Sequence, residues 1–235
     1  MTAVADHHVM ASSKLRRLRL VWEQPETHRF VEVGQLTELA DQGRYSFQYS
    51  PGIQDLGLVP LTEFPEFSAT YVSEWLPAFF LNRVMSARRP SYYAYLSWLG
   101  LSGSTEPMEI LARTGGGRAT DDFHVLDTFD VQNGHRVGWF PASGIARIDG
   151  ASGRVVDLRA GDELAIVDQV RDARNHRTML LSAPDGAPVG YVPDWLVDEV
   201  DQMRQTGPVT IFVEQVNLDA PDHLKLLCRL EAPAD

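Results

Sequence analysis

Cysteine is almost absent from this sequence: Cys228 is the single example among 235 residues. One cysteine cannot form an internal disulfide, and it has no companion thiols with which to build a zinc site. It follows Leu226 and Leu227 in an apolar run, which favours a buried thiol in a strand over a reactive nucleophile. The sequence therefore excludes a disulfide-stabilised fold and agrees with a reducing compartment.

Long hydrophobic runs are missing as well. No uninterrupted apolar stretch approaches the roughly 20 residues that a membrane-spanning helix needs, although hydrophobic residues make up 44% of the chain. Residues 1–13 lack the basic-then-apolar order of a secretory signal. We therefore expect a cytoplasmic protein with no membrane partner, in which residues 1–14 form a flexible N-terminus.

Positive charge is scarce in the second half of the chain. Residues 1–119 hold 11 Lys and Arg against 12 Asp and Glu, whereas residues 120–235 hold 10 against 20, and the net charge is -11. A strongly acidic half repels a phosphate backbone unless its few arginines converge locally. A nucleic-acid site in this half requires such a convergence.

Signatures of catalysis are also lacking. Ser143 is not preceded, two residues earlier, by the glycine that a nucleophile elbow needs. The histidines of the second half stand singly rather than at the spacing of metal ligands, and they are His124, His135, His176 and His223. We therefore predict a protein that is not an enzyme and that has no cofactor and no metal site.

The first half mixes period-two and helical patterns. Strands are predicted over residues 15–22, 29–36 and 45–49. The arginines of the first strand form either a solvated sheet face or a basic stripe. After Pro65 the period becomes helical through Tyr71, Trp75 and Phe79, and a second helix is predicted from Tyr92 to Leu99. The aromatic residues of these helices belong either to the core or to a base-stacking surface.

A glycine run separates the two halves. The segment 114–122 contains Gly115, Gly116 and Gly117, but no Lys-Ser/Thr pair follows it and the next segment reads as a strand rather than a helix. This composition is typical of a linker. We therefore place an N-terminal domain at residues 15–113 and a C-terminal domain at residues 123–232.

The C-terminal domain is predicted to be mainly β. Glycine-containing turns separate its short strand candidates, which are residues 123–129, 136–140, 142–148, 154–158, 163–170, 179–182, 189–192, 209–217 and 224–230. One helix is predicted over residues 194–205, with Asp194 as its N-cap. Many short strands with one helix favour a small barrel, so the whole chain is predicted to be α+β, with an antiparallel sheet and helices followed by a β-barrel.

The C-terminal half resembles a HIRAN domain. The resemblance lies in Ser143–Ile148, Leu158–Leu164, Asp172–Asn175 and Asp185–Pro193, and it covers most of residues 123–230. It implies an OB-like β-barrel in which some members of the family capture single-stranded DNA ends. The chain departs from the family where His176-Arg177-Thr178 follows Asn175, in a loop that is shorter than usual.

This departure gathers basic residues, which could hold phosphates, beside aromatic residues on which a base could stack. A solvated loop paired with Asp168 and Asp172 is the alternative. The predicted nucleic-acid site consists of Arg147, Arg171, Arg174, His176, Arg177, Tyr191 and Trp195.

The N-terminal half is similar to the N-terminal subdomain of HipA-type proteins. The residues that carry the similarity are Val33–Leu36, Tyr45–Tyr49 and Leu76–Asn82. No kinase core follows them in this chain, so the similarity implies a partner-binding role rather than kinase activity. Two hypotheses follow: a DNA-associated binding protein that engages single-stranded or end-exposed DNA, or a protein–protein adaptor that recruits its partner through the N-terminal domain.

Overall fold

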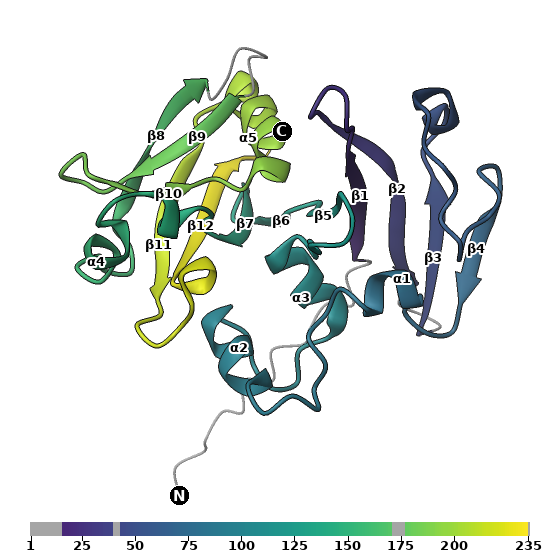
Figure 1. Ribbon diagram of the computed structural model, residues 1–235, viewed down its shortest axis with the longest axis horizontal. Coiled ribbons are helices and arrows are strands. Elements are labelled where there is room, and N and C mark those ends of the chain that lie inside the picture. The colour runs from purple at the N-terminus through teal and green to yellow at the C-terminus, as the bar shows by residue number, and fades with distance from the viewer. Residues whose placement is uncertain (1–15, 40–42, 171–176, 235) are drawn as a thin grey trace, which may run out of the picture.

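The computed structural model describes residues 16–39, 43–170 and 177–234, which form two antiparallel sheets and a few short helices (Figure 1). The α+β class is therefore confirmed. The predicted flexible N-terminus, residues 1–14, lies outside the described residues.

The first sheet has five strands in the order β4-β3-β2-β1-β5. Their bounds are β1 Arg17–Glu23, β2 Phe30–Leu39, β3 Arg44–Tyr49, β4 Thr70–Ser73 and β5 Phe123–Asp127. The three strands predicted first are present, because alternating apolar side chains give β1–β3 a buried face. Residues 70–73 form β4 instead of the predicted helix, so the helical period after Pro65 was a wrong interpretation of Tyr71.

The strand β5 belongs to this sheet. Its residues pair with β1, from Leu18 opposite Asp127 to Trp22 opposite Phe123. The sequence placed these residues at the start of the C-terminal domain because a glycine run precedes them. Long-range pairing decides their position, so the chain crosses the predicted linker and then completes the first sheet.

The second sheet has seven strands in the order β10-β9-β8-β11-β12-β7-β6. Their bounds are β6 Asp130–Gln132, β7 His135–Pro141, β8 Glu163–Val170, β9 Arg177–Ser182, β10 Pro188–Tyr191, β11 Thr210–Val216 and β12 Leu226–Pro233. Among the described residues this sheet is open, so the predicted closed barrel is wrong. The edge strand β10 forms an isolated bridge, between Ser143 and Tyr191, with the segment after β7.

Two segments predicted as strands in this half are helical. Residues 142–148 contain the 3₁₀ turn η2 (Ile145–Arg147), and residues 154–158 overlap the helix α4 (Ala151–Val155). Gly144 and Gly150 precede these turns with positive φ, and each lets the chain reverse direction where a strand would have continued.

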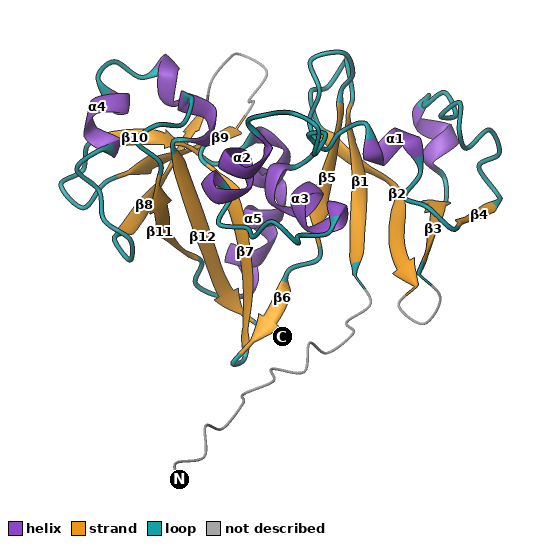
Figure 2. Ribbon diagram, turned by 90° about the horizontal axis from the view of Figure 1, so that it is seen from below, coloured by secondary structure: helices purple, strands orange, loops and turns teal. Residues whose placement is uncertain are grey.

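The remaining helices lie largely between the two sheets. Figures 1 and 2 show α2, α3 and α5 in this central position. The bounds of these helices are α1 Ala78–Leu81, α2 Tyr92–Trp98, α3 Pro107–Thr114 and α5 Asp194–Thr206. The 3₁₀ turns besides η2 are η1 Ile53–Leu56 and η3 Asp222–Leu224. The predicted helices 92–99 and 194–205 are confirmed, whereas α3 was missed.

The two halves pack directly against each other. Val21 of β1 and Leu126 of β5 are buried in the same hydrophobic cluster as the inner face of the second sheet. Helices α2 and α3 share a further cluster with Ala220 and Leu224. The aromatic residues of the first half lie partly in the core and partly at the surface: Phe80 is fully buried, while Trp75 is 78% exposed.

Arginines of the first half also hold the halves together. Arg19 of β1 pairs with Glu199 of α5, and Arg113 of α3 lies over the Trp139 ring of β7, with the guanidinium carbon 4.1 Å from the ring centroid. Of the arginines predicted on the first strand, Arg19 contacts the second half, Arg16 pairs with Glu109 of α3 and Asp127 of β5, and Arg17 is exposed. This face is therefore partly solvated and partly used in contacts within and between the halves.

Candidate nucleic-acid interface

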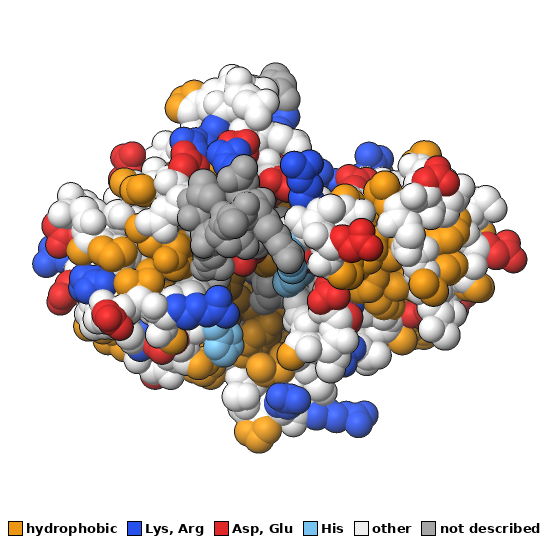
Figure 3. Space-filling view, turned by 45° about the horizontal axis from the view of Figure 1, so that its top comes forward, with side chains coloured by type: hydrophobic (Ala, Val, Ile, Leu, Met, Phe, Trp, Pro, Cys, Tyr) orange, Lys and Arg blue, Asp and Glu red, His pale blue; other side chains and the backbone are white. Residues whose placement is uncertain are grey.

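A cavity of about 440 Å³ opens at the junction of the two halves. Figure 3 shows a hollow there, with histidine and basic side chains on its rim. The walls come from β1 and β2, from β5, from the segment around η2, from the start of α5 and from η3. The residues that line the cavity are Glu23, Phe30, His124, Ser143–Arg147, Pro193, Asp194, Trp195, Asp222 and His223.

An indole and an imidazole form one wall. Trp195 lies in the first turn of α5, which begins after Pro193 because proline fixes a φ suited to a helix start. Asp194, predicted as the N-cap, is the first residue of the helix instead. The Trp195 ring stacks on His124 of β5, with centroids 6.1 Å apart and planes 16° from parallel. Trp195 is only 9% exposed, so its ring is held by its neighbours and little of it reaches the cavity.

The glycine run packs against both rings. Gly115 ends α3 with φ +70, and a Cβ built on it would lie 2.5 Å from Trp195 Cε2. A Cβ on Gly117 would lie 2.6 Å from His124 Cε1. The absence of side chains therefore lets the rings rest on the backbone. The segment predicted as a linker is part of the structure that positions the stacked pair.

Arg83 fixes the glycine run by hydrogen bonds to it and to the residues that follow it. Its guanidinium donates hydrogen bonds to the carbonyl oxygens of Gly116 at 3.0 Å and Phe123 at 3.1 Å, and to Asp121 Oδ1 at 2.8 Å. The guanidinium carbon lies 4.3 Å from the centroid of the Phe79 ring. Burial lowers the pKa of Arg83 although Asp121 opposes this shift. The arginine holds the backbone beneath the rings in place.

His124 is held in its neutral form. Burial lowers the pKa of this imidazole, the positive charge of Arg83 lowers it further, and the nearby carboxylates Glu23, Asp121 and Asp194 oppose the shift. A neutral imidazole stacked on an indole offers a flat and nearly uncharged surface.

The turn η2 presents a cation, Arg147, at the rim of the cavity. Ser143 exchanges two backbone hydrogen bonds of 2.9 Å with Tyr191, after which Gly144 turns the chain into η2. Arg147 lies at the end of this turn with an exposed side chain, and no described carboxylate pairs with it. Tyr191 packs its ring beneath Gly144, where it supports the turn.

Two of the acidic residues of the cavity are already paired. Asp222 accepts a hydrogen bond from Ser152 Oγ at 3.0 Å and forms an ion pair with Lys225 at 2.9 Å, and the bonds with Lys225 and Ser152 lower its pKa. The Glu23 carboxylate lies 2.8 Å from His28 Nδ1. These contacts reduce the repulsion that an incoming phosphate would meet beside Arg147 and His223.

The structure divides the predicted site. Arg147 and Trp195 line the junction cavity and Tyr191 supports it. Arg177 lies elsewhere, because its guanidinium donates two hydrogen bonds to Asp201 of α5 at 2.7 and 3.0 Å and lies 3.6 Å from Asp168. The bond to Asp201 raises the pKa of Arg177 and lowers that of Asp201. Three further predicted residues lie outside the described residues: Arg171, Arg174 and His176.

Sequence reasoning missed the two histidines of the cavity. His124 and His223 were treated as isolated residues, yet β5 and η3 bring them to the same opening. They are 99 positions apart, and no local spacing could have joined them. The glycine run was the one available signal, since three adjacent glycines permit close packing as well as flexibility.

Within the described residues, no group of three His, Cys, Asp or Glu side chains is arranged to hold a metal ion. None of the described helices has the length and apolar character that crossing a bilayer requires. Comparison with protein-family models, with curated proteins and with solved structures found no match.

Proposed function

We propose that this protein is a non-enzymatic, DNA-associated binding protein that engages single-stranded or end-exposed DNA in the junction cavity. The observation that carries the proposal is that one cavity is lined both by a stacked aromatic pair and by a cation that has no described carboxylate partner. Trp195 stacked on His124 supplies the first, and Arg147 supplies the second. An unstacked base can stack on an aromatic ring, and a guanidinium can bind its phosphate.

The proposed resemblance to HIRAN domains, which rests on sequence motifs, points to the same function, although the second sheet, among the described residues, does not form the barrel that this resemblance implies. The segment Ser143–Ile148, which carries part of the resemblance, supplies one wall of the cavity. Duplex DNA fits this arrangement poorly, because its bases are stacked on each other and cannot reach a recessed ring. We therefore propose that the protein prefers single strands and free ends to blunt duplexes.

The test is fluorescence anisotropy of a labelled single-stranded oligonucleotide with the wild-type protein and two arginine variants. Arg147→Ala removes one phosphate contact, so the slope of log K against log salt should become less steep by about 0.7 and the affinity should fall. Arg177→Ala is the matched control, because Asp201 and Asp168 already occupy that guanidinium.

The proposal requires salt-sensitive binding that weakens in Arg147→Ala and stays unchanged in Arg177→Ala. Wild-type protein that fails to bind any oligonucleotide even at low salt would overturn it. A loss in Arg177→Ala with no change in Arg147→Ala would move the site from the junction cavity to the start of β9.

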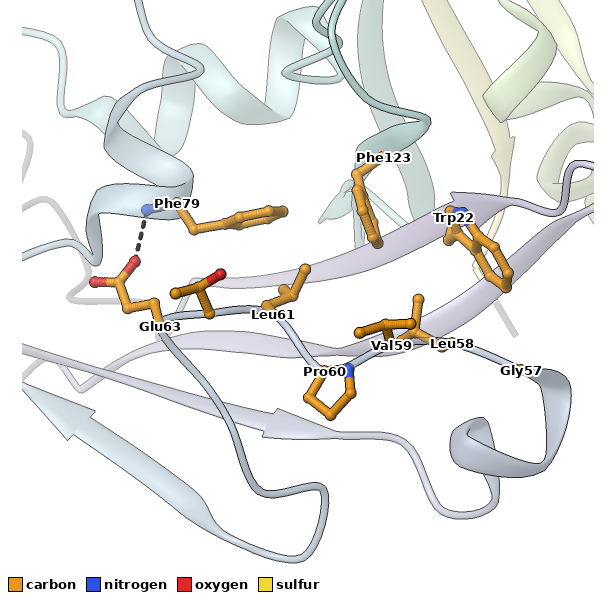
Figure 4. Close-up of a pocket in the computed structure, with 10 residues that line it drawn as sticks. Trp22, Gly57, Leu58, Val59, Pro60, Leu61, Glu63, Phe79 and Phe123 are labelled. Atoms are coloured by element: carbon orange, nitrogen blue, oxygen red, sulfur yellow. Dashed lines mark hydrogen bonds between the residues drawn. The ribbon is translucent and has the colours of Figure 1, made fainter.

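An apolar groove favours a second candidate function, that of a protein–protein adaptor. A cavity of about 520 Å³ lies beside the first sheet, and Figure 4 shows Trp22, Phe79 and Phe123 facing the segment Leu58–Leu61 across it. Val59 of this segment is 78% exposed. The carboxylate of Glu63 accepts hydrogen bonds from the Ala78 and Phe79 amides, which fixes the groove's far end.

A partner that inserts an apolar side chain would suit this groove, which lies in the half that resembles the HipA N-terminal subdomain. A pull-down with wild-type protein and with Val59→Asp tests the adaptor. A partner that is captured by the first and lost by the second supports it, whereas retention by both variants rules out the groove as the docking site.

A further inference from the structure

A further cavity, of about 710 Å³, lies on the N-terminal half between the α1–α2 segment and the glycine run. Three arginines line it: Arg83 lies shortly after α1, Arg89 lies in the segment before α2, and Arg118 directly follows Gly117. The rings of Tyr92 and Tyr95 belong to the same wall. No acidic residue is among the lining residues, although the chain carries a net charge of -11.

The two outer arginines are available to a ligand. Arg89 and Arg118 are exposed, and neither has an ion pair with a described carboxylate. Some other arginines of the described residues are paired, as Arg19 is with Glu199 and Arg177 with Asp201. Two guanidinium groups with no ion pair to a described carboxylate, beside a cavity whose lining residues include no carboxylate, favour a local positive potential that the overall charge of the protein does not predict.

A smaller cavity of about 340 Å³ shares lining residues with this cavity and with the junction cavity. It shares Arg83, Tyr95 and Gly117 with the arginine-lined cavity, and it shares Trp195 and His223 with the junction cavity. Gly116 and Gly117 line this smaller cavity. Because glycines carry no side chains, a ligand can lie close to the backbone there.

We propose that the three cavities form one continuous groove and that Arg89 and Arg118 bind the phosphodiester backbone of a single strand whose end or base occupies the junction cavity. This inference rests on the proposed function and extends it to the N-terminal half. Guanidinium groups match phosphate oxygens in charge and in hydrogen-bond geometry. The glycine run lies under the strand.

The test compares the double variant Arg89→Ala/Arg118→Ala with the single variant Arg88→Ala in anisotropy titrations of labelled oligo-dT. Arg88 is an exposed neighbour on the same segment, but it does not line the cavity. Loss of two phosphate contacts should reduce the salt slope by about 1.4, which corresponds to roughly tenfold weaker binding at about 0.2 M salt and roughly 65-fold at about 0.05 M. Arg88→Ala should bind like the wild type.

Strand length gives a second readout. An oligonucleotide of about four nucleotides should reach only one end of the groove, and one of about twelve should span both ends. The double variant should therefore weaken binding of the long strand much more than binding of the short one. Unchanged far-UV circular dichroism and thermal midpoint would show that the exposed substitutions leave the fold intact.

The outcomes separate the two proposals. If wild-type protein binds and the double variant behaves like Arg88→Ala, the extended groove is wrong while the junction site stands. If wild-type protein binds no oligonucleotide, the proposed function fails and the groove fails with it. Strong loss in the double variant for the long strand alone supports the groove.

Discussion

Substituting alanine at Gly115 should destabilise the protein more than any other glycine-to-alanine change in the glycine run. Two effects add at this position. The residue has φ +70, in the left-handed region, which costs an L-residue about 1–2 kcal/mol. The new Cβ would also lie 2.5 Å from the Trp195 ring, and overpacking of this kind costs about 1–3 kcal/mol. The expected loss is about 2–5 kcal/mol, out of a typical total of about 5–15 kcal/mol.

Three other glycines separate these two effects. Gly134 has φ +81 and open space around its Cβ position, so Gly134→Ala carries the backbone strain alone. Gly117 would meet His124 at 2.6 Å and has no positive φ, so Gly117→Ala carries the steric clash alone. Gly153 lies in α4 with nothing within 4 Å, and Gly153→Ala should be neutral or stabilising by about 0.5–1 kcal/mol.

Urea denaturation followed by tryptophan fluorescence and by circular dichroism measures all four variants. The loss in Gly115→Ala should approximate the sum of the losses in Gly134→Ala and Gly117→Ala. The midpoint should shift by about 1–2 M if the slope is about 2–3 kcal/mol per M. A Gly115→Ala midpoint no lower than that of Gly134→Ala would refute the reasoning, because it would mean that the Trp195 indole does not rest on the glycine run.

Two further predictions concern titrating and nucleophilic groups. Because the folded state lowers the pKa of His124, the unfolded state binds more protons as pH falls below about 6.5. The free energy of unfolding should therefore decrease from pH 8 to pH 5.5 by a larger amount in the wild type than in His124→Gln; parallel curves would contradict this. Cys228 is fully buried and burial raises the pKa of its thiol, so it should react with a thiol reagent only on unfolding, and rapid labelling of native protein would contradict its placement in β12.

The sequence predicted elements well where a local pattern decides the structure. The bounds of β8 agree with the predicted strand 163–170, and α5 extends only one residue beyond the predicted helix. These segments have clear periodicity and end at turn residues. The helix α3 was missed because Pro107–Thr114 is short and runs into the glycines that were interpreted as a linker.

The candidate site depended on information that no local pattern contains. The sequence named Arg147, Tyr191 and Trp195, and the structure brings them to one region. It could not show that Arg177 forms an ion pair with Asp201, which lies 24 positions further along the chain. It also treated His124 as part of the C-terminal domain, whereas pairing of β5 with β1 places this residue in the first sheet. Long-range pairing and burial of charge therefore decide which predicted residues share a site.

The location of the DNA on the protein is the central claim, and photo-crosslinking measures it most directly. An oligonucleotide with iodouracil at its terminal base, bound to the wild-type protein and irradiated, should attach to aromatic or histidine side chains of the junction cavity. Mass spectrometry should then find the crosslink in peptides that contain Trp195, His124 or His223. Crosslinks confined to the β8–β9 region, or to the apolar groove around Val59, would contradict the account.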